Sequence, residues 1–150
     1  MSSAEIFYSF FQKEPSMTTS AHGRVNLIGE HTDYNNGFVL PSLIPQSIEV
    51  SINLRDDDKI IGISSEFGEL RSLTSSSNDG SWLDFVRGAI YFCQKISPSI
   101  KGIEVAVSST IPSGSGLSSS AALEIALLRA ITKLKDISIH SQEMAKIGQK

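Results

Sequence analysis

The feature that most constrains this chain is a glycine- and serine-rich segment at residues 111–122, IPSGSGLSSSAA. The residues before it alternate as in a β-strand, with Ile103, Val105 and Val107 on one face. The residues after it repeat apolar side chains at spacings of three and four, which is typical of a helix: Leu123, Ala126, Leu127, Ala130, Ile131 and Leu134. A strand, a glycine loop and a helix start together can bind phosphate, because glycines let backbone N–H groups approach an anion. The segment therefore indicates a phosphate site.

Three consecutive serines, Ser118–Ser120, add hydroxyl groups that can cap the helix, bind a phosphate or ligate Mg²⁺. A flexible linker is rejected, because the glycine- and serine-rich run is short and passes directly into the helical pattern. A plain strand-to-helix turn stays open as an alternative. No lysine follows the glycines as in a GxxxxGK[ST] loop, so a bound nucleotide would be held largely by backbone N–H groups and the helix dipole.

Residues 112–121, PSGSGLSSSA, resemble the P-x-x-x-G-L-S-S-S-A phosphate loop of the GHMP kinases, the family of galactokinase, homoserine kinase and mevalonate kinase. The resemblance implies that ATP binds here through its phosphates. The residues it assigns to them are Gly114, Ser115, Gly116, Leu117, Ser118, Ser119 and Ser120. It also makes Ser120 a Mg²⁺ ligand. Glu124, one helical turn further on, is a second candidate for Mg²⁺, although a solvated helix residue is the simpler interpretation.

A second informative stretch, residues 21–41, gathers polar side chains between two strand-like segments and before an Asn-Asn-Gly turn signal. These side chains are Glu30, His31, Asp33 and Tyr34. Folding does not require so many polar groups in one loop, whereas paired carboxylates and a histidine suit hydrogen bonds to sugar hydroxyls. Structural interpretations stay open. Asp33 could be a turn residue, Glu30 a solvated charge, and His31 a structural histidine whose hydrogen bonds are satisfied within the fold. Their spacing matches no strong metal-ligand pattern.

Residues 23–35, GRVNLIGEHTDYN, resemble the galactokinase signature almost letter for letter, whereas other GHMP kinases share only its outline. The resemblance implies that Glu30, His31 and Asp33 contact the sugar hydroxyls. It also implies that Arg24 is the catalytic arginine near the transferred phosphoryl group, the fixed cation that such a transfer needs. By its residue type, Arg24 could equally be a surface charge. His22 stands where the family usually has proline, and it adds a titratable group beside the site.

The composition limits the classes of protein to which this chain can belong. With 150 residues, 40% of them hydrophobic, we expect one domain, residues 1–150, with its own core. The net charge of -3 argues against a nucleic-acid partner. The single cysteine, Cys93, allows no internal disulfide, suits a reducing compartment and lies in an apolar helical pattern that predicts a buried thiol. We find no secretory signal and no membrane-spanning run, so we expect a cytoplasmic protein without a membrane partner, and a monomer.

The fold that the resemblance implies is α+β, a ribosomal S5 domain 2-like N-terminal domain of GHMP kinases. In it, helices cover one face of a mixed, mainly antiparallel sheet. Strand-like segments between Gln46 and Leu73, with helical patterns on either side, agree with that class. Two capping-box pairs, Ser2 with Glu5 and Ser81 with Asp84, predict where the first two helices begin.

The function that the resemblance implies is galactokinase activity, the transfer of the γ-phosphoryl group of MgATP to the C1 hydroxyl of galactose. Galactokinases are more than twice this length, and the family's catalytic aspartate is expected beyond Lys150. We therefore expect the 150-residue chain by itself to be inactive or nearly so. Two alternatives stay open. One is a sugar 1-kinase for N-acetylgalactosamine, arabinose or a uronic acid, and the other is a sensor that binds galactose and ATP without catalysis.

Overall fold

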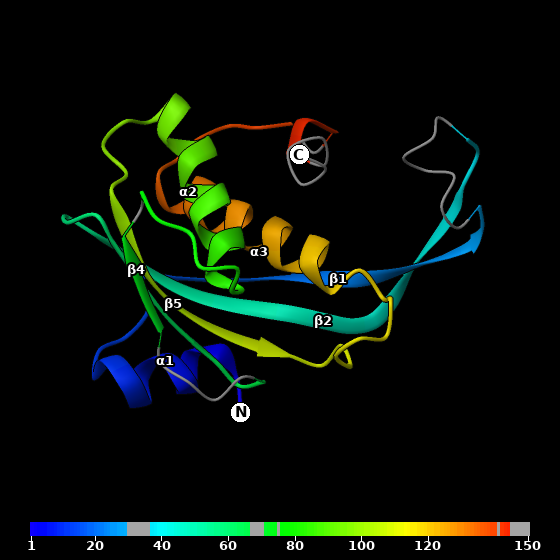
Figure 1. Ribbon diagram of the computed structural model, residues 1–150, viewed down its shortest axis with the longest axis horizontal. Coiled ribbons are helices and arrows are strands. Elements are labelled where there is room, and N and C mark those ends of the chain that lie inside the picture. Colours follow the sequence, from blue (N-terminus) through cyan, green and yellow to red (C-terminus); the bar gives the residue numbers. More distant parts are fainter. Residues whose placement is uncertain (30–36, 67–70, 75, 141, 145–150) are drawn as a thin grey trace.

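A computed structural model describes residues 1–29, 37–66, 71–74, 76–140 and 142–144. Within these residues the strands form one five-stranded sheet with the order β1-β2-β5-β3-β4 (Figure 1). The strands are β1 (Met17–Ile28), β2 (Leu40–Arg55), β3 (Lys59–Ser64), β4 (Arg71–Thr74) and β5 (Gly102–Ser109). Neighbouring strands pair antiparallel except β3 and β5, which are parallel. The expected α+β class with a mixed, mainly antiparallel sheet is confirmed.

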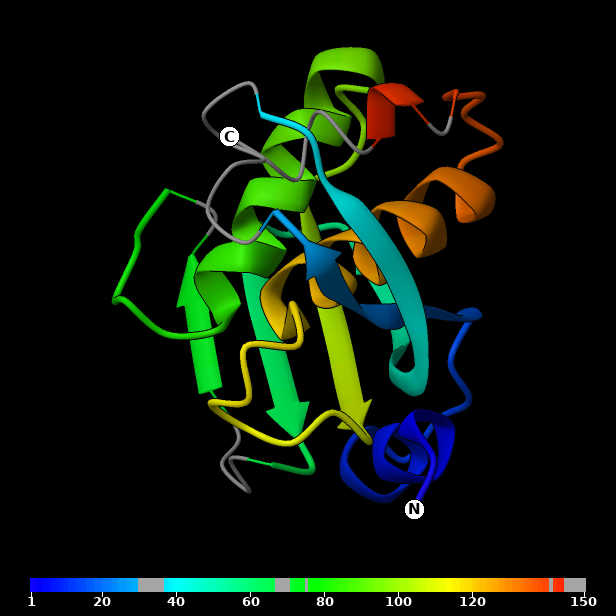
Figure 2. The same cartoon turned by 90° about the vertical axis from the view of Figure 1, so that its right-hand side faces the viewer.

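The helices are α1 (Ser3–Phe11), α2 (Leu83–Ile96) and α3 (Ser119–Leu134). Helices α2 and α3 cover one face of the sheet, as expected, and α1 packs against the opposite face (Figures 1 and 2). On β5, Val105 belongs to the core under α2 and α3, whereas Ala106 belongs to the cluster under α1. Strand β5 is therefore buried on both faces, which explains its nearly continuous apolar sequence.

The start of α1 follows the sequence prediction, and the start of α2 does not. The Ser2 hydroxyl accepts the N–H of Glu5, and the Glu5 carboxylate accepts the N–H of Ser2 at 2.7 Å, so this capping box is formed. Helix α2 begins at Leu83, after Trp82. The Ser81 hydroxyl accepts the N–H of Leu83, while the Asp84 carboxylate accepts the N–H of Gly80. The predicted Ser81–Asp84 box is thus wrong, because Ser81 lies one residue too early to cap this helix.

Only part of the apolar side chains of α2 is buried. Phe85 and Ile96 are 37% and 50% exposed. The buried side chains are Leu83, Val86, Ala89, Ile90 and Cys93. Cys93 is a buried thiol as predicted, and burial raises its pKa to about 11, so the neutral thiol is the form present at neutral pH.

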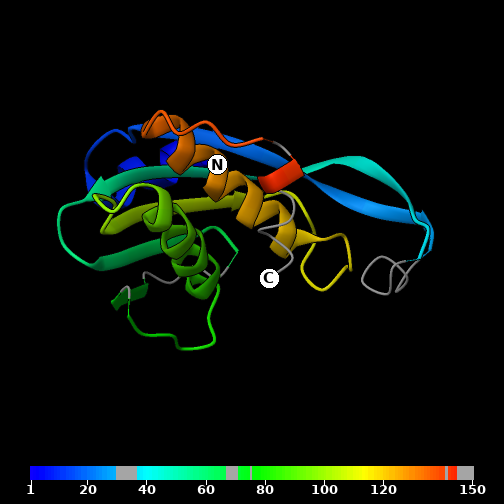
Figure 3. The ribbon, with the colours of Figure 1, turned by 90° about the horizontal axis from the view of Figure 1, so that it is seen from above.

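The elements nearest the phosphate loop are the β1–β2 hairpin and α3. The distal part of the hairpin extends past the rest of the sheet, and the chain from β5 to α3 passes beside it (Figure 3). Helix α3 packs on both β1 and β2. The Thr19 hydroxyl of β1 donates to the carbonyl of Ala126 at 2.6 Å and fixes this packing. Among the described residues, none of the helices has the length and hydropathy needed to span a bilayer.

Candidate active site

The loop between β5 and α3 has the strand–loop–helix arrangement that the sequence predicted. Strand β5 ends at Ser109 and α3 begins at Ser119. Three residues of the loop have positive φ angles, 68° at Gly114, 70° at Gly116 and 59° at Ser118. Left-handed residues that alternate with ordinary ones turn successive backbone N–H groups toward one side and form a concave anion site. The glycines adopt this conformation without a Cβ penalty, and Ser118 keeps it despite one.

The first turn of α3 is suited to an anion. Ser118 is the N-cap residue, but its side chain makes no capping hydrogen bond, and the first turn contains no acidic residue. The first backbone N–H groups of the helix, at the positive end of its dipole, are thus not satisfied by a side-chain cap. Ser119 and Ser120 are exposed at this end. The Ser115 hydroxyl instead donates to the carbonyl of Pro112 at 2.7 Å and stabilises the loop itself.

Strand β1 brings Arg24 to this loop. The backbone N–H of Arg24 donates to the carbonyl of Leu117 at 3.1 Å. The side chains of Arg24 and Ser118 line one cavity of about 210 Å³ between β1 and the start of α3. The other lining residues are Ala21, His22, Leu43, Ala121, Ala122, Ile125 and Arg129. Arg24 and the loop between β5 and α3, which are distant in the sequence, therefore lie side by side.

Two further basic side chains belong to this cavity, and the sequence analysis missed one of them. His22 is exposed at the cavity and lies two residues before Arg24 in β1. Arg129 lines it from α3, and its guanidinium donates to the carbonyl of Ser20 at 2.9 Å. Arg129 continues the helical face of Ala122 and Ile125 at spacings of three and four, a signal that could have identified it. Two arginines, Arg24 and Arg129, are among the described residues that line the cavity, a composition that suits a phosphorylated ligand.

The residues assigned to sugar contact, Glu30, His31 and Asp33, lie outside the described residues. Their role stays a prediction. Strand β1 continues past Arg24 to Ile28 and ends before Gly29, which has a φ of 91°.

Ser120 and Glu124 offer oxygen atoms of the kind that Mg²⁺ prefers, and a spacing of four places them on the same side of α3. Glu124 is half-buried instead of fully solvated, and burial raises the pKa of its carboxyl. No group of three or more His, Cys, Asp or Glu side chains that could hold a metal lies within the part of the chain that the structure describes. These two residues fit a metal held mainly by a nucleotide, as Mg²⁺ commonly is.

The raised pKa of Glu124 gives a testable effect on stability. We expect Glu124→Gln to increase the free energy of unfolding at pH 7 by less than about 1 kcal/mol, because solvent still screens a half-exposed carboxylate. Burial favours the protonated carboxyl, so its contribution to stability is present at low pH and is lost as the pH rises through the folded-state pKa.

The gain should therefore disappear when urea unfolding is repeated below the ordinary carboxyl pKa of 4.5. Glu143→Gln, at an exposed position, is the matched control. A loss of stability at pH 7 in Glu124→Gln would contradict the prediction.

Comparisons with known proteins show which proteins this chain resembles. Residues 5–54 match the galactokinase galactose-binding signature, and residues 84–150 match the N-terminal domain of the GHMP kinases. Over these two ranges the chain is thus similar to one class of proteins, the GHMP kinases. Within this class it is similar to the N-terminal part of galactokinases: it is 38% identical to the galactokinase of Actinobacillus succinogenes over 99% of the chain. It spans about 40% of that protein's length.

Solved structures give the same result. The crystal structure of Lactococcus lactis galactokinase complexed with galactose is 33% identical and has a TM-score of 0.83, covering 98% of this chain and 40% of the other. The crystal structure of Methanococcus jannaschii mevalonate kinase is 23% identical and has a TM-score of 0.73. The match covers 88% of this chain and 44% of the mevalonate kinase chain, and the two share the fold. The galactokinase resemblance seen in the sequence is confirmed.

Proposed function

We propose that the full-length protein containing this chain is a galactokinase, which transfers the γ-phosphoryl group of MgATP to the C1 hydroxyl of galactose. The observation that carries this proposal is the contact between strand and loop. The Arg24 N–H donates to the Leu117 carbonyl at 3.1 Å, which puts the signature arginine beside the phosphate loop. The matching galactose-binding signature and the similarity to a galactokinase solved with galactose support this choice of sugar.

Residues of this chain would act mainly by positioning and electrostatics. Backbone N–H groups of residues 114–120 and the positive end of α3 would bind the ATP phosphates. Ser120 would hold Mg²⁺, with Glu124 as the second candidate; the metal, when bound, neutralises phosphate charge. Arg24 would stabilise the negative charge that develops on the transferred group. Glu30, His31 and Asp33 would hydrogen-bond the sugar hydroxyls.

The domain, its cellular location and its oligomeric state are also part of the proposal. Residues 1–150 would form the N-terminal GHMP domain of a cytoplasmic, monomeric enzyme whose ligands are galactose and ATP. The family's catalytic aspartate would come from beyond Lys150, so the 150-residue chain should show no turnover by itself. Robust turnover by the purified 150-residue chain would contradict this expectation.

The test is ATP turnover by the full-length gene product with galactose, N-acetylgalactosamine, arabinose or a uronic acid as the acceptor. We expect ADP release that depends on galactose, with galactose 1-phosphate as the product. Turnover with another of these sugars, but not with galactose, would keep the chemistry and reject the proposed substrate. Galactose binding measured by calorimetry without turnover would reject the enzyme in favour of the sensor.

A further inference from the structure

Gly23 lies where β1 passes closest to the phosphate loop. It is buried, and a Cβ built on it would lie 2.8 Å from the carbonyl oxygen of Leu117. The same Cβ would lie 2.9 Å from Cδ1 of Ile44 and 3.0 Å from Cδ1 of Ile111. These separations are shorter than a carbon atom can adopt in a close-packed interior without displacing its neighbours. Any side chain at this position must therefore displace the loop, the two isoleucines, or β1 itself.

Gly23 differs in this from the glycines of the loop. A Cβ on Gly114 or Gly116 would meet nothing within 4 Å, and both residues have positive φ angles. Those two glycines provide a backbone conformation, whereas Gly23 provides space for another segment of backbone.

The carbonyl that limits the space at Gly23 is the one that Arg24 binds. The Leu117 carbonyl accepts the Arg24 N–H, and Leu117 is followed by Ser118, the N-cap of α3. The pairing of β1 with β2 shifts register at this point, between the pairs His22–Ser47 and Arg24–Leu43. Residues 44–46 of β2 lie opposite Gly23, and they include Ile44, which packs against it. The irregular pairing therefore coincides with the contact between β1 and the loop.

We propose that Gly23 is a positioning residue that sets the distance between Arg24 and the phosphate loop. The expected loss of activity depends on the proposed kinase function, whereas the expected displacement of the loop does not. A methyl group at position 23 would push the Leu117 carbonyl away, weaken its bond to the Arg24 N–H and shift Ser118 with the start of α3. The ATP phosphates would then be held out of line with the Arg24 side chain. Misplacement on the order of 1 Å can reduce a rate by about a hundredfold.

The functional test compares Gly23→Ala with Gly88→Ala in the full-length protein. We expect Gly23→Ala to lower kcat/KM for ATP by about a hundredfold. The affinity for galactose, measured by calorimetry, should stay within about twofold, because the sugar contacts are assigned to other residues. Gly88 lies on α2, where a Cβ would meet nothing within 4 Å, so Gly88→Ala should keep full activity. Wild-type kinetics in Gly23→Ala would overturn the proposal.

A third variant separates displacement of the loop from general crowding. Ile44→Val and Ile111→Val together remove both Cδ1 atoms near position 23 and leave only the Leu117 carbonyl in the way. Gly23→Ala in that background should stay defective relative to the two isoleucine substitutions by themselves. Full recovery would show that crowding of side chains, not the position of the loop, caused the defect. This background also serves if Gly23→Ala does not fold.

The structural part is tested without catalysis, on the full-length protein by amide NMR. Gly23→Ala should shift the amide signals of Leu117 and Ser118, and Gly88→Ala should not. Unchanged loop signals would overturn the inference even if the protein is a galactokinase. If the wild-type protein phosphorylates no sugar, the proposed function fails, while the amide shifts still decide whether Gly23 positions the loop.

Discussion

Arg24→Ala in the full-length protein is expected to lower kcat for galactose phosphorylation by about a thousandfold or more, the range for an arginine that stabilises a phosphoryl-transfer transition state. The expectation depends on the position of Arg24, whose backbone N–H is bonded to the loop between β5 and α3 and which lines the cavity at Ser118. The N–H group that bonds Leu117 is retained in alanine, so the loop should keep its place. The defect should then appear in the chemical step, measured by single-turnover kinetics.

Two further variants make the Arg24 result interpretable. Arg24→Lys keeps the charge but loses the planar, multidentate guanidinium, so its rate should fall between wild type and Arg24→Ala. Arg71→Ala is the matched control, since Arg71 lies on β4 at the opposite edge of the sheet from β1. We expect that control to keep wild-type kcat. If Arg24→Ala lowers kcat by less than about tenfold with an unchanged melting temperature, Arg24 is not the charge-stabilising group.

The parts of this fold that the sequence predicted are those that local signals determine. The glycine pattern of residues 111–122 predicted a loop between a strand and a helix. The structure has that loop, with left-handed residues at Gly114, Gly116 and Ser118. The Ser2–Glu5 capping box formed because its two side chains need only each other's backbone. The similar Ser81–Asp84 spacing failed, because Trp82 packs against Gly62 and the chain enters α2 one residue later than the spacing implies.

The parts that the sequence did not predict depend on contacts between distant segments. Helix α1 covers the second face of the sheet, an arrangement that its amphipathic pattern is compatible with but does not specify. Gly23 was one letter of a matching signature, and its packing against Leu117 appears only once β1 and the loop are brought together. The spacing of Arg129 places it on one face of a helix. That this face lines a cavity appears only in the structure, where residues of β1 lie opposite it. Local pattern cannot supply such information.

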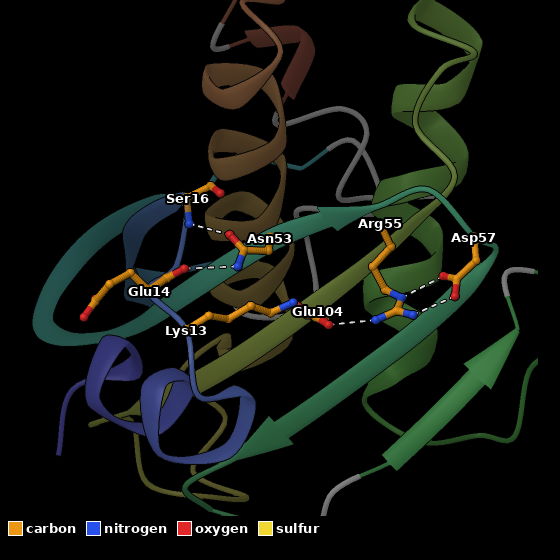
Figure 4. A network of polar contacts seen from close by, with 7 residues as sticks. All are labelled: Lys13, Glu14, Ser16, Asn53, Arg55, Asp57 and Glu104. Carbon is orange, nitrogen blue, oxygen red and sulfur yellow. Dashed lines mark hydrogen bonds and ion pairs between the residues drawn. The ribbon is translucent and has the colours of Figure 1, made fainter.

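Glu104 is the clearest case of a residue whose role depends on distant contacts. Alternation along β5 puts it on the face opposite Val105, where an exposed charge would be the simple expectation. In the structure, Glu104 is only 5% exposed and lies between two cations (Figure 4). Lys13, beyond the end of α1, is 2.7 Å from one carboxylate oxygen, and Arg55 of β2 is 2.7 Å from the other. Arg55 also pairs with Asp57, mainly by hydrogen bonding, and lowers the pKa of that carboxyl to about 2.

Glu104→Ala is therefore expected to lower the free energy of unfolding by about 3 kcal/mol, the size found when one partner of a buried ion pair is removed. The variant loses two ion pairs, leaves a void, and keeps the Arg55 charge partly buried with Asp57 as its remaining partner. The melting temperature should fall by roughly 10 °C in a domain of this length. Urea unfolding followed by circular dichroism measures the free energy directly.

Companion variants identify which part of the Glu104 cluster matters. The Lys13 side chain is 50% exposed and can return to water, so Lys13→Ala should cost less than about 1 kcal/mol. Glu104→Gln keeps the shape and removes the charge, so it should fall between wild type and Glu104→Ala. Glu104→Leu tests whether the ion pairs stabilise the fold or only determine how α1 docks on the sheet. An apolar side chain of similar size avoids the cost of burying a carboxylate. If Glu104→Leu is as stable as wild type, the ion pairs select how α1 docks and add no net stability. If it is as unstable as Glu104→Ala, the charges themselves hold α1 to the sheet.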